Sequence, residues 1–178
     1  MTPTSPAFAA ACLCFALFAL FAGVGPAAAQ NADSPFGSFK HDATQPIEIT
    51  ADSLAVNQAS ETATFEGEVV AGQGTLRLTA DKVVVSYGGD GGGDAGRIDS
   101  LRAEGSVFLS NGSETARGAW ADYDVAGGKV AMGGGVVLTQ GENAISGETL
   151  DIDLNAGAGR ISGGRVRSVF TPPAGDDG

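Results

Sequence analysis

The fold class is decided by the stretch Gly67-Glu-Val-Val-Ala-Gly-Gln-Gly-Thr-Leu-Arg-Leu-Thr-Ala-Asp-Lys-Val-Val-Val85. Apolar and polar residues alternate in Leu76-Arg77-Leu78, and the apolar run from Val83 to Val85 continues the pattern. A period of two is typical of a strand with one buried and one wet face. Gly74 stands between the two halves, where it suits the left-handed backbone of a hairpin turn. The stretch therefore predicts a strand, a turn and a second strand.

The alternation continues on both sides of this stretch. It is clearest at Ile47–Ile49, Leu54–Val56, Leu150–Leu154 and Arg165–Arg167. No window of helical length shows a 3.6-residue period, and 28 Gly and 7 Pro among 178 residues make long helices improbable. The sequence predicts an all-β fold, a sandwich, barrel or roll.

A unit of glycine followed two residues later by valine recurs along the chain as an internal repeat. It starts at Gly67, Gly105, Gly134 and Gly164, at intervals of 38, 29 and 30 residues. Further glycines follow seven residues after the first three, and we expect them at hairpin turns: Gly74, Gly112 and Gly141. Acidic residues, which we expect at strand starts, also repeat: Asp52, Asp81, Asp122 and Glu148. Such small units cannot bury their own apolar faces, so they are predicted to stack on one another.

The long first interval contains a low-complexity insert, Gly88–Gly96, made of Gly, Asp and Ala. It is expected to form a loop, because a longer loop costs little stability. Its composition is similar to calcium-binding β-roll repeats, but its Asp94 stands one residue late for that register. A structural or calcium-binding β-roll therefore stays as an alternative.

Residues 1–29 are expected to form a secretory signal peptide cut after Ala29. They contain no Lys, Arg, Asp or Glu, and their apolar run ends before the small residues Ala27-Ala28-Ala29. Both cysteines, Cys12 and Cys14, lie in this segment, so the mature domain would have no disulfide. An uncleaved membrane anchor is the competing interpretation. We expect a flexible segment at 30–45, one folded domain at 46–170 and a flexible tail at 171–178.

The charge and the scarcity of reactive side chains exclude several functions. Ten Lys and Arg against 21 Asp and Glu give a net charge of −11, which repels nucleic acid. The only histidine, His41, stands in the polar N-terminal segment, and the mature chain has no cysteine, so nucleophilic catalysis and thiolate or imidazole metal sites are not expected. We predict that the chain is not an enzyme and carries no cofactor. Periodicity alone does not distinguish a filled β interior from one that holds a ligand.

Several segments resemble the organic-solvent-tolerance (OstA-like) family. They are Gln45–Asp52, Ala63–Val69, Gln73–Val85, Gly147–Leu150 and Gly164–Val166, and the resemblance covers about residues 42 to 172. It implies an OstA-like β-jellyroll of many short antiparallel strands with open ends. It also implies the function of the family's periplasmic bridge proteins, which carry lipopolysaccharide (LPS) from the inner to the outer membrane with the lipid A acyl chains in an apolar groove.

The resemblance further implies partners and contact residues. The partners would be an inner-membrane LptC-type anchor of the same fold, an outer-membrane LptD-type translocon and further copies of the chain stacked end to end. The first strand, Ile47–Ile49, and the last, Arg165–Phe170, would be the docking edges. Lipid contacts would lie at Ile47, Ile49, Phe65, Val107, Phe108, Tyr123 and Val125. Candidate basic contacts are Arg77, Lys82 and Arg102, and the alternative role with the same fold is that of the membrane-anchored LptC-like partner.

Overall fold

The computed structural model describes residues 42, 44–88 and 97–171. The expected signal peptide, nearly all of the expected segment 30–45, residues 89–96 of the insert and the tail beyond Thr171 lie outside the described residues. Within the described ranges, no helix has the length and apolar character needed to cross a membrane.

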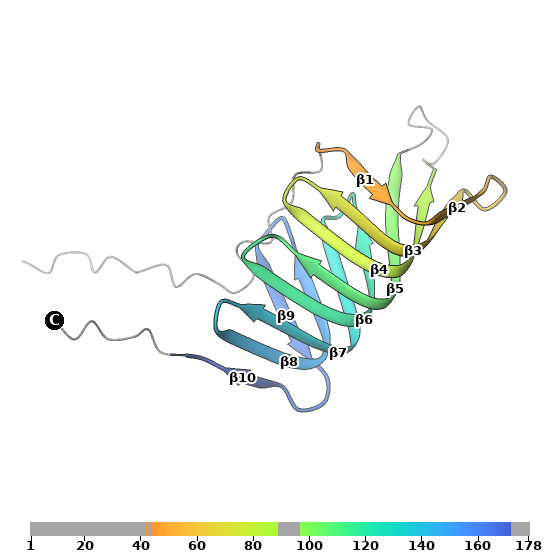
Figure 1. Cartoon of the computed structure of the whole chain (residues 1–178). Coiled ribbons are helices and arrows are strands. Elements are labelled where there is room, and N and C mark those ends of the chain that lie inside the picture. Colours follow the sequence, from red (N-terminus) through yellow and green to blue (C-terminus); the bar gives the residue numbers. More distant parts are fainter. Residues whose placement is uncertain (1–41, 43, 89–96, 172–178) are drawn as a thin grey trace, which may run out of the picture. The chain divides into compact units, whose positions relative to one another are not determined.

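The described chain forms one sheet of ten strands (Figure 1). The strands are β1 (Ile47–Thr50), β2 (Ser53–Asn57), β3 (Thr62–Gln73), β4 (Leu76–Tyr87), β5 (Ile98–Ser110), β6 (Glu114–Asp124), β7 (Lys129–Gln140), β8 (Asn143–Asp153), β9 (Ala158–Ser162) and β10 (Arg167–Val169). Their order is β1-β3-β4-β5-β6-β7-β8-β10, with β2 also paired to β3 and β9 to β8. All of these pairs are antiparallel. The all-β prediction is confirmed.

The repeat glycines mark the places where the long strands bend. The pairing register shifts between Glu66 and Val69 in β3, and at the equivalent places in β5 and β7. Gly67, Gly105 and Gly134 lie in these bulges with φ values of 85°, 76° and 81°. A bulge bends a strand, and glycine adopts positive φ without steric cost. The sheet therefore folds over at the bulges into two facing layers (Figure 1).

Layer A consists of β1, β10 and the halves of β3 to β8 that meet at the turns near Gly74, Gly112 and Gly141. Layer B consists of β2, β9 and the other halves of β3 to β8. The three turn glycines have φ values of 59°, 102° and 56°, so the expected hairpin turns are confirmed. Leu76–Leu78 and Val83–Val85 belong to a single strand, β4, which crosses from layer A to layer B.

The expectation that the repeated acidic residues stand at strand starts is wrong for three of the four. Asp81, Asp122 and Glu148 lie within β4, β6 and β8. Their role follows from the bulges: Asp81 packs against Gly105 and Glu148 against Gly163, as Asp52 does against Gly67. In the remaining unit Ala119 packs against Gly134, so Asp122 is not the equivalent residue.

The last strand is shorter than predicted. β10 spans only Arg167–Val169, while Arg165, Val166 and Phe170 are exposed and lie outside the strand. The period-two pattern of Arg165–Arg167 is too short to separate a strand from the extended chain that leads into it. At the other end of the sheet, β1 starts at Ile47 as expected.

Candidate functional site

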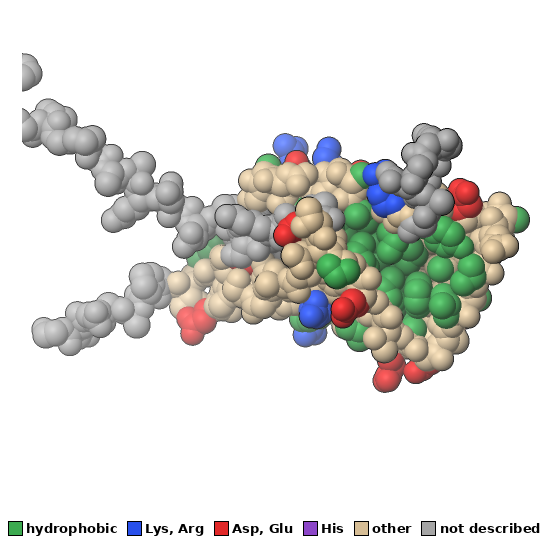
Figure 2. All heavy atoms as spheres, turned by 90° about the horizontal axis from the view of Figure 1, so that it is seen from above, with side chains coloured by type: hydrophobic (Ala, Val, Ile, Leu, Met, Phe, Trp, Pro, Cys, Tyr) green, Lys and Arg blue, Asp and Glu red, His purple; other side chains and the backbone are tan. Residues whose placement is uncertain are grey.

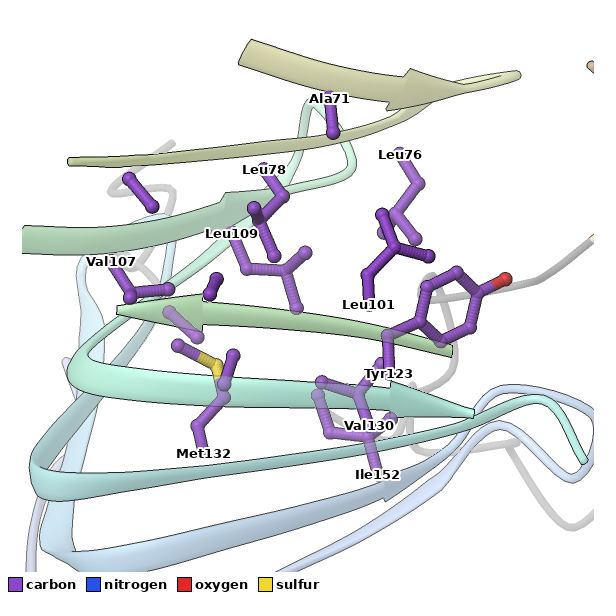
Figure 3. Close-up of a cluster of buried hydrophobic side chains, with 14 of the residues drawn as sticks. Ala71, Leu76, Leu78, Leu101, Val107, Leu109, Tyr123, Val130, Met132 and Ile152 are labelled. Atoms are coloured by element: carbon purple, nitrogen blue, oxygen red, sulfur yellow. The ribbon is translucent and has the colours of Figure 1, made fainter. Parts of the chain in front are cut away.

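An aliphatic interior lies between the two layers. Layer A contributes Leu76, Leu78 and Leu109, and layer B contributes Leu101, Tyr123 and Val130 (Figure 3). These side chains point inward because alternate residues of a strand face opposite sides of a sheet. Leu109 and Met132 are 1% and 0% exposed. The described interior is thus a filled core over most of its length.

One apolar pocket interrupts this core on the side of β1. It is lined by residues of both layers, namely Ile47, Ala71, Gly72, Gln73, Leu76, Leu78, Leu101, Leu109, Tyr123 and Val130. Its volume is only about 30 Å³. An acyl chain would therefore have to displace side chains in order to enter.

A buried hydrogen bond joins the two layers at this pocket. The Tyr123 hydroxyl of layer B donates to Gln73 Oε1 of layer A at 2.8 Å. Burial raises the pKa of Tyr123 to about 12, and the charge of Asp124 adds to the shift. The hydroxyl therefore keeps its proton at neutral pH and remains a donor. Gln73 Nε2 donates in turn to the backbone carbonyl of Gln45 at 2.9 Å, just before β1.

The interior is uncovered at the end formed by β1 and β2. Leu54 and Val56 of β2 are 56% and 58% exposed, although their partners Phe65 and Ala63 belong to the core side of β3. Seen from this side, hydrophobic side chains form one broad area (Figure 2). An exposed apolar area of this kind marks a site for a ligand or a partner.

Six of the seven predicted contact residues belong to the core or pack against it. Val107, Tyr123 and Val125 are buried in it, and Ile47, Ile49 and Phe65 are partly buried against it. Phe108 does not join them. It alternates with the buried Val107 and Leu109 and lies on the outer face, where the Arg117 guanidinium is 5.2 Å from its ring. The expectation that Phe108 faces the interior is therefore wrong.

Sequence reasoning missed Gln73, Leu101, Leu109 and Val130, which also line the pocket. The two leucines and the valine follow the period-two pattern of their strands, which indicates that they face the interior. Many other core residues share this pattern, so it does not identify the three as pocket residues. Gln73 was named only as the first residue of a segment that carries the family resemblance. A polar side chain at an inward-facing position was the available signal.

The three candidate basic contacts all lie outside the interior. Lys82 pairs with Glu66 at 3.3 Å. Arg102 pairs with Glu104 and Asp122, and Arg77 donates to the carbonyls of Gly74 and Leu76. In the part of the chain that the structure describes, none of these side chains lines the pocket.

One buried carboxylate lies on the inner face of layer A. Glu114 is 0% exposed and accepts hydrogen bonds from the side chains of Gln140, Asn111 and Ser113. These contacts tie the β5–β6 turn to the end of β7 and leave neither carboxylate oxygen without a donor. Among the described residues, no group of three or more His, Cys, Asp or Glu is placed to hold a metal ion.

The family described as LptA/(LptD N-terminal domain) LPS transport protein matches residues 48–158. An uncharacterized protein of Rhizobium meliloti (strain 1021) is 31% identical over 153 residues, 82% of each chain. The lipopolysaccharide export system protein LptA of Escherichia coli (strain K12) is 28% identical over 142 residues, 74% of each chain.

The crystal structure of LptH from Pseudomonas aeruginosa has a similar fold. LptH is the LptA-homologous periplasmic component of the lipopolysaccharide transport device of that organism. The two structures align with a TM-score of 0.64 at 20% identity, over 72% of this chain and 96% of LptH. This likeness supports the β-jellyroll fold.

Proposed function

The chain belongs to the LptA/LptD N-terminal domain family of LPS transport proteins, and from this premise we propose that it is a periplasmic LPS carrier. It holds the lipid A acyl chains between layers A and B and passes LPS from the inner toward the outer membrane. The observation that carries the proposal is the apolar interior, uncovered at the β1 and β2 end. The named relatives supply the ligand class.

Apolar burial provides the driving force for lipid binding. Each methylene removed from water contributes about 0.8 kcal/mol. The charged side chains Lys82, Arg102 and Asp122 lie on the outer face of layer B, outside the pocket. Binding by acyl chains is therefore compatible with a net charge of −11, because repulsion beyond about 10 Å is screened at 0.1 M salt.

A depletion experiment tests the carrier function. We expect newly made LPS to accumulate at the inner membrane when this protein is depleted from its cells, and to reach the surface again when it is restored. Pulse labelling followed by membrane fractionation measures the distribution. Unchanged delivery of LPS to the surface after full depletion would contradict the proposal.

The ends of the sheet are proposed to bind partners of the same fold. Within the described residues, β1 and β2 each pair on one side with β3, and β10 pairs on one side with β8, so their other edges are free of a partner strand from these residues and could accept one. Val169 and Phe170 at the β10 end are 63% and 64% exposed. Strand addition at these edges would stack copies end to end and join the chain to LptC-type and LptD-type partners.

Charge placed on the β2 end is expected to prevent this stacking. In the double variant Leu54→Lys, Val56→Lys the oligomers should fall to monomers, because the junction would bury two lysines against the exposed apolar Val169 and Phe170 of the next copy. Thermal stability should change little, since both side chains are more than half exposed. Light scattering coupled to size exclusion measures the mass. Val137→Lys, on the outer face of layer A, is the control and should still associate.

The mature protein is proposed to be residues 30–178, exported by a signal peptide cut after Ala29, with its folded domain at 46–170. The absence of charge in residues 1–29 and the three alanines before Gln30 support this. N-terminal sequencing of the exported protein should begin at Gln30. A mature chain beginning at Met1 would instead favour the membrane-anchored, LptC-like role.

A further inference from the structure

The outer face of layer A is basic, although the chain carries a net charge of −11. Arg77, Arg117 and Arg167 lie on this face, in β4, β6 and β10, and all three are exposed. They face outward because Arg77 alternates with the buried Leu76 and Leu78, while Arg117 and Arg167 belong to one cross-strand row. Among the described residues that the strands of layer A direct outward between the bulges and the turns, Glu48 is the only carboxylate.

The outer face of layer B has the opposite character. It carries six carboxylates, those of Glu66, Glu104, Asp122, Asp124, Asp151 and Asp153. Several of them pair with basic neighbours, as Glu66 does with Lys82 and Asp122 with Arg102. In the described ranges, by contrast, no carboxylate lies within ion-pair distance of the three arginines of layer A. Their charge is therefore available to a partner outside the chain.

Apolar side chains are mixed with these arginines. Val70 and Val137 are 41% and 42% exposed, and Phe108 lies between them in the same cross-strand row. The Arg117 guanidinium is 5.2 Å from the Phe108 ring. An exposed apolar row flanked by arginines, with few carboxylates, has the composition of an interaction surface.

We propose that the outer face of layer A docks on an anionic lipid bilayer. The arginines would contact the phosphate groups of the lipids, because a guanidinium offers phosphate two parallel N–H donors. Val70, Phe108 and Val137 would insert between the headgroups. The interior takes no part in this contact, which is therefore independent of LPS carriage.

The apolar row favours a bilayer over a soluble polyanion. A polyanion in water would pair with the arginines and leave Val70 and Val137 exposed. A bilayer offers phosphate groups at its surface and hydrocarbon directly below them, so it satisfies both kinds of side chain.

The acidic residues of layer B do not prevent this docking. Packed sheets lie about 10 Å apart, so the carboxylates on the outer face of layer B are farther than that from lipids at layer A. The Debye length is about 8 Å at physiological ionic strength, and the repulsion is largely screened.

Co-sedimentation with vesicles tests the docking. The wild-type protein should bind vesicles of equal parts phosphatidylglycerol and phosphatidylcholine, but not vesicles of phosphatidylcholine alone. Each arginine near an anionic surface is worth about a fivefold factor in binding, so Arg77→Gln, Arg117→Gln should weaken it about 25-fold. Lys82→Gln, Arg102→Gln is the matched control. It removes the same positive charge from layer B and should leave binding unchanged.

A further variant tests the apolar row. Val70→Ser, Val137→Ser keeps every charge and should weaken binding about fivefold, because less apolar surface enters the headgroup region. Thermal unfolding checks that each variant is folded. Equal weakening by both charge variants, equal binding to both kinds of vesicle, or no binding by the wild type would overturn the inference. A loss in the arginine variant with none in the serine variant would assign the face to a soluble polyanion and overturn docking on a bilayer.

Discussion

Replacing Gly105 by alanine is expected to destabilise the protein by about 3 kcal/mol. Gly105 has a φ of 76°, where a side chain costs about 1–2 kcal/mol. An added methyl group would also lie 2.9 Å from both Cβ and Cγ of Asp81 and closer still to its Oδ2. The substitution would strain the bulge at Gly105, where β5 bends so that layer A folds over layer B and encloses the interior. Denaturant unfolding measures the free energy.

A second glycine separates the two causes. Gly141 has a φ of 56°, and an added methyl group would meet nothing within 4 Å, so Gly141→Ala should cost only about 1 kcal/mol. Adding Asp81→Gly to Gly105→Ala should recover part of the difference. If the two substitutions were simply additive, contact with Asp81 would play no part.

Truncation of Leu109 to alanine is expected to cost about 2–5 kcal/mol of stability. Leu109 is 1% exposed, and its loss leaves a cavity that the surrounding strands close only in part. Val137→Ala, on the outer face of the same layer and 42% exposed, should cost about 0.5 kcal/mol. Thermal or denaturant unfolding of both variants checks the contrast.

The same variant links the core to the ligand site. Leu109 lines the pocket, so its truncation should widen the space for an acyl chain and tighten the binding of an acyl detergent while stability falls. A core with no part in binding would show the loss of stability alone.

The sequence predicted the fold class because period-two patterning and the glycine repeat are local signals. The hairpin glycines Gly74, Gly112 and Gly141 were placed correctly, since positive φ is a property of single residues. The roles of Gly67 and Gly105 as bulges were not predicted, because a bulge depends on the register with the neighbouring strand. The residue opposite a bulge also depends on the register between strands. For this reason the sequence suggested Asp122 as the equivalent of Asp81, whereas in the structure Ala119 packs against the bulge glycine Gly134.

The lipid contacts implied by the resemblance stay a prediction, and the structure shows only where they lie. Six of the seven belong to the core or pack against it. Phe108 was included because the family resemblance implied it, although it follows the buried Val107 directly and adjacent residues of a strand face opposite sides. The Gln73–Tyr123 contact joins residues 50 positions apart in the chain, and only the folding of layer A over layer B brings them together.

The most direct test of lipid carriage uses two adjacent residues of β1. Ile49 is partly buried against the core, and Glu48 is exposed on the opposite face. A photo-crosslinking amino acid is introduced at each position in turn, and the irradiated cells are examined for LPS attached to this protein. We expect labelling from position 49 and little from position 48. Labelling from position 48 alone, or equal labelling from both, would contradict carriage of the acyl chains in the interior.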